Sequence, residues 1–209
     1  MELTGWKEKL QSILEWVMRL AYVNILWLCG ILLGLVAAGF FPATIAMFAV
    51  IRKWLLKDDD LKAGAYFWKT YKSEMLKGNA YGYIWLALGL MLYFDLTFFR
   101  SFSNLASLIF TYITFILGVV YTCALLFAFP VYVHYDQRVV KAVKNSILLT
   151  ISSPVFAIVL VVAFGLPYYA VFKLPGLLPF YGGSLISFCL LFMSIKLFEN
   201  LDNRQLKKD

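Results

Sequence analysis

The sequence predicts an all-α, polytopic transmembrane helical bundle that forms a single domain, residues 1–209. Hydrophobic residues make up 62% of the chain, and its mean hydropathy is +0.79. Only 15% of the residues are charged, against about 25% in soluble domains. The apolar residues also fall in uncharged runs that approach or exceed the length of about 20 residues that a helix needs to cross a bilayer. Lipid is therefore the expected solvent for much of the surface.

The first expected element is an amphipathic helix over residues 4–18. Trp6, Leu10 and Ile13 recur on one stripe of this helix, and charged residues occupy its other faces. An apolar stripe beside charged faces is typical of a helix that lies in the membrane interface.

Residues 20–51 then form an uncharged run that is too long for one upright crossing. The segment from Gly39 to Pro42 interrupts this run, because proline fits the first turn of a helix and disfavours a helical residue before it. We therefore predict two membrane helices, at residues 20–38 and 42–57. A single crossing by the whole run is the alternative, and it would give five crossings in total instead of six.

A second interfacial helix is expected at residues 58–77. Leu61, Trp68 and Met75 recur at helical spacing among lysines, acids open the segment, and Gly78 closes it. Four more apolar runs predict the remaining membrane helices, at 81–99, 105–133, 147–172 and 180–198.

The distribution of basic residues predicts the orientation. With six crossings, both termini and the long polar links share one side, which holds all 19 Lys and Arg residues except Arg100 and Lys173. Cytoplasmic loops carry an excess of Lys and Arg, so we predict that both termini are cytoplasmic. With five crossings the N-terminus would lie outside, and the polar links would still be cytoplasmic.

Five residues are candidates for helix packing. Gly30, Gly34 and Ala38 follow one another at a spacing of four, which lets a second helix approach closely. We expect this stripe to pack inside the bundle, and contact with a second copy in a homo-oligomer is the alternative. Asn24 is expected to bond to a neighbouring helix, because lipid offers its amide no partner. Pro42 is expected to mark the break described above.

Asp95 is an acid inside an apolar run, and acids within membrane helices are candidates for function. It lies about one turn from Arg100 and from the predicted outer interface, where water or an ion pair can satisfy its charge. We favour this structural interpretation.

Two polar segments could dock a cytoplasmic partner. They are the 58–77 helix and the link between the 105–133 and 147–172 helices, and solvated helix ends are the alternative interpretation. The candidate docking residues in them are Trp68, Lys69, Tyr71, Lys72, His134, Asp136 and Arg138.

Recognisable catalytic patterns are missing from the sequence. It has no phosphate-binding GxxxxGK[ST] loop, no HExxH and no GxSxG. The three cysteines lie in apolar runs, and His134 is the single histidine, so a metal site would lack ligands. We expect no enzymatic activity, no cofactor and no metal. The net charge of +7 comes from residues at helix ends, which indicates contact with the lipid bilayer and not with nucleic acid.

Several short motifs follow one another along the chain: Asn24–Trp27, Phe41–Ala46, Val50–Trp54, Phe67–Lys72, Phe129–Asp136 and Lys141–Ser146. In this order they resemble the motifs of the YesL-like family of uncharacterised bacterial integral membrane proteins. The resemblance implies a Gram-positive source, a place in the bacterial plasma membrane, and association with ABC importers of plant-cell-wall sugars. It supplies no catalytic residues.

Two functions remain open at this point. The resemblance implies an accessory or regulatory partner of a carbohydrate (oligosaccharide) ABC importer, which would contact the permease subunits. The chain lacks the cytoplasmic EAA-type loop expected of a permease subunit itself. The alternative is a small transporter or channel, which would need a polar cavity at the membrane midplane. The candidates to line such a cavity are Asn24, Thr44, Asp95 and Ser152.

Overall fold

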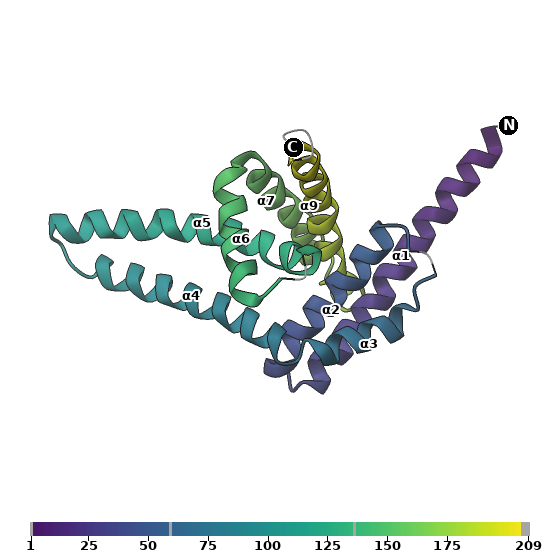
Figure 1. The fold of residues 1–209 in the computed structure, drawn as a ribbon, viewed down its shortest axis with the longest axis horizontal. Coiled ribbons are helices and arrows are strands. Elements are labelled where there is room, and N and C mark those ends of the chain that lie inside the picture. The colour runs from purple at the N-terminus through teal and green to yellow at the C-terminus, as the bar shows by residue number, and fades with distance from the viewer. Residues whose placement is uncertain (1, 59, 136, 206–209) are drawn as a thin grey trace.

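The structure is a computed structural model that describes residues 2–58, 60–135 and 137–205. Every regular element in these residues is helical, and Figure 1 shows their arrangement. The elements, in chain order, are α1 (Glu2–Leu33), α2 (Ala37–Leu55), α3 (Ala63–Ser73), α4 (Lys77–Arg100), α5 (Leu105–Tyr135), α6 (Val139–Ser152), α7 (Pro154–Lys173), the 3₁₀ turn η1 (Pro175–Leu177), α8 (Leu178–Tyr181) and α9 (Ser184–Gln205).

Within the described residues, five helices are long and apolar enough to cross a membrane. They are α1 (as Trp6–Leu33), α2, α4, α5 and α7. A sixth crossing results if Pro175–Tyr181 and Ser184–Asn200, which meet at a bend of 64°, act as one broken span. The prediction of an all-α bundle is confirmed. Residues 20–51 belong to two candidate spans, as predicted, and not to a single crossing, so the choice between five and six crossings depends instead on the bent last segment.

Helix α1 corrects the first expected boundary, because it is continuous from Glu2 to Leu33. The interfacial helix predicted at 4–18 is the first half of the same helix as the crossing predicted at 20–38. No proline separates the two halves, and extending an existing helix is easier than nucleating a new one. The helix ends at a tight turn in which Leu35 and Val36 adopt positive φ angles of 51° and 64°.

Pro42 does not mark the break between two helices that the sequence predicted, because it lies inside α2. A proline within a helix cannot donate to the carbonyl four residues earlier, which here belongs to Ala38. The side-chain amide of Asn79 donates to this carbonyl instead, at 2.8 Å. A partner from α4 therefore replaces the missing bond and allows α2 to begin at Ala37.

Helix α3 is shorter than the 58–77 helix that the sequence predicted. A turn at Glu74, Met75 and Leu76 separates it from α4, so Gly78 opens α4 and does not close α3. Further on, the helix predicted at 147–172 is two helices that meet at Ser153. Proline suits the first turn of a helix and keeps the residue before it extended, so Pro154 begins α7. Helix α6 takes up most of the expected polar link.

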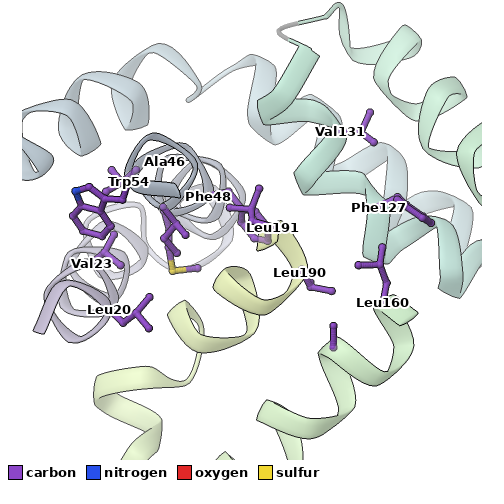
Figure 2. Close-up of a cluster of buried hydrophobic side chains, with 14 of the residues drawn as sticks. Leu20, Val23, Ala46, Phe48, Trp54, Phe127, Val131, Leu160, Leu190 and Leu191 are labelled. Carbon is purple, nitrogen blue, oxygen red and sulfur yellow. The ribbon is translucent and has the colours of Figure 1, made fainter. Parts of the chain in front are cut away.

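Helix α2 is the centre of the molecule. It packs against α1, α3, α4, α5 and α9, and it contributes more buried residues than any other described helix. Figure 2 shows part of the main hydrophobic core, with side chains from α1, α2, α5, α7 and α9. The labelled core residues are Leu20, Val23, Ala46, Phe48, Trp54, Phe127, Val131, Leu160, Leu190 and Leu191.

The α4–α5 hairpin extends away from the other helices (Figure 1). In its far part, residues 86–119, most of the large apolar side chains are exposed, including Phe94 at 65% and Leu105 at 74%. Exposed apolar area on this scale is unfavourable in water, at about 25 cal/mol per Å². The far end of the hairpin is therefore suited to contact with lipid, and the polar residues that could form a site lie at the C-terminal end of α5 and in other helices.

Candidate functional site

The small-residue stripe lies at the junction of α1 and α2. A methyl group at Gly34 would overlap the backbone of Gly39, and one at Gly30 would lie 3.1 Å from the Cβ of Ala43. Both glycines are buried and pack within this chain. Ala38 does not extend the stripe along α1, because it lies beyond the turn, at the start of α2.

Asn24 is fully buried and joins α1 to the bend between α8 and α9. Its side-chain amide donates to the carbonyl of Pro179 at 2.8 Å. Its carbonyl oxygen accepts from the backbone N–H groups of Gly183 and Ser184, each at 3.0 Å. The first N–H groups of a helix lack hydrogen-bond partners within the helix. Asn24, from a distant part of the chain, accepts the hydrogen bonds of two such N–H groups at the start of α9.

Thr44 uses its hydroxyl in a similar way within the core. It accepts from the indole nitrogen of Trp27 at 3.0 Å and donates to the carbonyl of Phe40 at 2.7 Å. The other two residues considered for a midplane cavity are Asp95, which is half-buried on α4, and Ser152, which is exposed at the end of α6. Asp95 forms no ion pair with Arg100 in the part of the chain that the structure describes.

A polar pocket of about 250 Å³ lies between the C-terminal ends of α2 and α5 and the face of α3. We call it the α2–α3–α5 pocket. Its polar lining residues are Arg52, Tyr66, Thr70, Glu74, Tyr132 and His134. In contrast, the pocket between α4, α5 and α7 and the one between α4 and α6 are lined mainly by apolar side chains.

Two contacts organise the α2–α3–α5 pocket. Nε of Arg52 donates to Nδ1 of His134 at 3.4 Å, and the hydroxyl of Tyr132 donates to Oε2 of Glu74 at 2.7 Å. The ring of Phe198, from α9, packs against the ring of His134 with their centres 4.5 Å apart. The first contact ties α2 to α5, and the second ties α5 to the end of α3. The pocket thus has a cationic wall at Arg52 and an anionic wall at Glu74.

Helix α3 is anchored by the aromatic residues that the sequence grouped with its lysines. Tyr71 is buried, and its hydroxyl donates to the carbonyl of Gly30 at 2.9 Å. Burial raises the pKa of the Tyr71 hydroxyl. Trp68 is partly buried and packs edge-on against Phe67. These aromatic side chains attach α3 to the bundle, and Lys69 and Lys72 remain exposed.

The other candidate docking residues occupy different environments. His134 is half-buried in the pocket, whereas Arg138 is exposed just before α6. Asp136 lies outside the described residues. The structure therefore brings His134 together with Arg52 and Glu74, and it leaves Lys69, Lys72 and Arg138 on the surface.

The sequence analysis did not single out Arg52, Glu74, Tyr66 or Tyr132. They come from α2, α3 and α5, and no short motif links them. One signal was present, since Arg52 is a charged residue directly after a long uncharged run. Within the described residues, no group of three or more His, Cys, Asp or Glu side chains could hold a metal ion.

Proteins of Bacillus subtilis (strain 168) are similar to the chain over most of its length. Uncharacterized protein YesV is 37% identical over 188 residues, which cover 90% of each protein. Uncharacterized protein YteU is 34% identical over 189 residues, or 90% of this chain and 85% of YteU. Uncharacterized protein YesL is 32% identical over 194 residues, or 92% of this chain and 91% of YesL. The chain belongs to the YesL-like family.

A family described as "Protein of unknown function, DUF624" matches residues 20–96. This part of the YesL-like chain contains Asn24, Arg52, the whole of α3 and Glu74, and it ends before the α5 side of the pocket. No solved structure is significantly similar to the chain. The names of the three relatives state no activity, so the function must be argued from the arrangement of the residues.

Proposed function

We propose that this YesL-like protein is an accessory or regulatory partner of a carbohydrate ABC importer in the bacterial plasma membrane, with both termini cytoplasmic, and that it is not an enzyme. The family resemblance supplies the link to an importer. The observation that carries the proposal is that the charged side chains and the exposed apolar side chains lie on different parts of the molecule. The α2–α3–α5 pocket and the lysines of α3 gather at one end of the bundle, and the α4–α5 hairpin exposes apolar side chains.

The surface proposed to contact the importer is the exposed face of α3. Lys69 and Lys72 are exposed there, and Tyr71 and Trp68 hold the helix in place from its other face. A rigidly held basic helix at the membrane surface can recognise an acidic loop by complementary charge, which mainly raises the rate and specificity of association. Arg138 adds a further exposed cation at the start of α6.

The alternative of a transporter or channel has less support. It requires polar groups that face an open path at the midplane, as in known transporters. Asn24 and Thr44 instead use their polar atoms to hold helices together. The accessory role is therefore the better supported of the two.

The proposal can be tested by purifying the tagged full-length chain from its host at native expression and identifying the importer subunits that accompany it. We expect permease subunits to co-purify, and we expect Lys69→Glu with Lys72→Glu to reduce their yield several-fold. A matched control is Lys7→Glu with Lys9→Glu, which changes the charge equally on exposed residues of α1.

Two outcomes would contradict the accessory role. One is a chain that purifies without importer subunits although the importer is expressed. The other is oligosaccharide uptake by liposomes that contain this chain alone, which would favour the transporter. Growth of a deletion strain on different oligosaccharides, with uptake measured directly, identifies the sugar concerned.

A further inference from the structure

The α2–α3–α5 pocket has opposite charges on its walls that do not neutralise each other. Arg52 and Glu74 both line it, yet no ion pair joins them among the described residues. Nε of Arg52 is bonded to His134, and the terminal amino groups of the guanidinium have no acceptor in the described part of the chain. Oε2 of Glu74 accepts from Tyr132, and Oε1 has no donor there.

Charges that are partly removed from water are unfavourable unless they are paired. Both Arg52 and Glu74 are half-buried. A ligand that forms an ion pair with both side chains therefore binds more favourably than a ligand that pairs with only Arg52 or only Glu74. An anion alone would meet Glu74, and a cation alone would meet Arg52. The lining therefore favours a ligand that carries both a negative and a positive group.

The surroundings indicate which negative group fits. The guanidinium fork matches the oxygens of phosphate and is always charged. Arg52 is the one basic side chain other than His134 that lines the pocket within the described residues. Arg52 lies in the last turn of a membrane helix, and α3 lies outside the candidate spans. The end of the pocket that holds Arg52 is therefore expected at the depth of lipid headgroups, where phosphate is abundant.

The size of the pocket is consistent with a small headgroup. A water molecule takes about 30 Å³ in the liquid, so a pocket of about 250 Å³ can hold a ligand several times larger than water. Tyr66 and Thr70 offer hydroxyl groups between the two charged walls. These hydroxyls can donate to phosphate oxygens or accept from an ammonium group.

We propose that the α2–α3–α5 pocket binds a phosphorylated primary amine, with the phosphate on Arg52 and the ammonium on Glu74. Phosphatidylethanolamine and free phosphoethanolamine share this chemistry. A primary ammonium donates hydrogen bonds to a carboxylate, whereas the methylated ammonium of phosphatidylcholine cannot. The site is independent of the proposed association with an importer.

The test uses the purified full-length protein and measures the affinity of each probe and the shift in thermal unfolding that it causes. We expect phosphatidylethanolamine to bind more tightly than phosphatidylglycerol or phosphatidylcholine when each is added in mixed micelles. Arg52→Gln should weaken binding about tenfold, as expected for the loss of a charged hydrogen-bond pair. Glu74→Gln should make phosphatidylethanolamine and phosphatidylglycerol bind equally.

The controls distinguish the loss of a specific binding site from a general change in charge and from misfolding. Lys53→Gln removes a neighbouring charge that pairs with Asp58 at 3.4 Å outside the pocket, and it should keep the lipid preference. Arg52→Lys keeps the charge without the fork and should weaken binding less than Arg52→Gln. Each variant must unfold at a temperature close to that of the parent in the absence of added lipid.

Free phosphoethanolamine distinguishes the two sources of the headgroup. If it competes with the lipid at low concentration, the natural ligand is soluble; if only the lipid binds, the ligand is a membrane component. Equal binding of all three lipids by the parent, or an unchanged preference in Glu74→Gln, would overturn the proposal. So would tighter binding of glycine than of phosphoethanolamine, since glycine carries a carboxylate in place of the phosphate.

Discussion

A buried amide in a membrane helix needs protein partners, because the hydrocarbon core supplies none. Asn24 is fully buried and makes three hydrogen bonds, to Pro179, Gly183 and Ser184. All three partners lie at the bend that leads into α9. A single side chain of α1 therefore fixes the position at which the last membrane segment begins.

We predict that Asn24→Ala destabilises the protein by about 1–3 kcal/mol, because it leaves buried backbone donors without an acceptor. The measurement is reversible unfolding in mixed micelles, followed by tryptophan fluorescence. Asn200→Ala, at an exposed position of α9, is the control and should have little effect. Equal stability of the Asn24 and Asn200 variants would show that the hydrogen bonds at the bend contribute nothing.

At the scale of the helix, the junction of α1 and α2 depends on glycine, because it lets the two backbones meet. Gly34 faces Gly39 at a distance that leaves no space for a Cβ. Gly118, in the middle of α5, has no heavy atom within 4 Å of the position that its Cβ would occupy. The same substitution should therefore have opposite effects at the two positions.

We predict that Gly34→Ala destabilises the protein by about 1–3 kcal/mol through overpacking. Gly118→Ala should leave the stability unchanged or increase it by up to about 1 kcal/mol, because alanine favours helix. The free energy of unfolding of both variants is to be measured in the same unfolding experiment in mixed micelles. A neutral Gly34→Ala would mean that α1 and α2 are further apart than the structure shows.

Helix α3 is held to α1 by the bond from Tyr71 to the carbonyl of Gly30. We predict that Tyr71→Phe weakens this attachment by about 1 kcal/mol, the usual net value of one hydrogen bond. Hydrogen exchange should become faster in residues 63–73 and stay unchanged in α7. Tyr112→Phe, on the exposed surface of α5, is the control. Unchanged exchange in α3 would show that aromatic packing alone holds it.

For the whole molecule, composition together with the lengths of the apolar runs was sufficient to predict an all-α membrane bundle and to predict two spans, not one, in residues 20–51. The boundaries near proline were harder to predict. Pro42 lies inside α2 because Asn79 of α4 bonds the carbonyl of Ala38, a long-range partner that local rules do not reveal. Pro154, in contrast, begins a new helix, as local rules predict.

The candidate site could be predicted only in part, for a similar reason. Arg52 and His134 are 82 positions apart, and Glu74 and Tyr132 are 58 apart, so no spacing rule brings them together. The sequence indicated His134 as a polar residue at a helix end but could not indicate its partners. It also grouped Tyr71 with the exposed lysines of α3, although an aromatic residue at helical spacing can equally face the core.

In the proposed orientation, the α2–α3–α5 pocket and α3 face the cytoplasm, and the bundle is embedded in lipid. The most direct measurement is labelling of single cysteines in intact cells by a reagent that cannot cross the membrane, after replacement of Cys29, Cys123 and Cys189. We predict that cysteine at position 69 is labelled only after the cells are opened and that cysteine at position 173 is labelled in intact cells. Labelling of position 69 from outside would contradict the proposed orientation and, with it, the cytoplasmic partner.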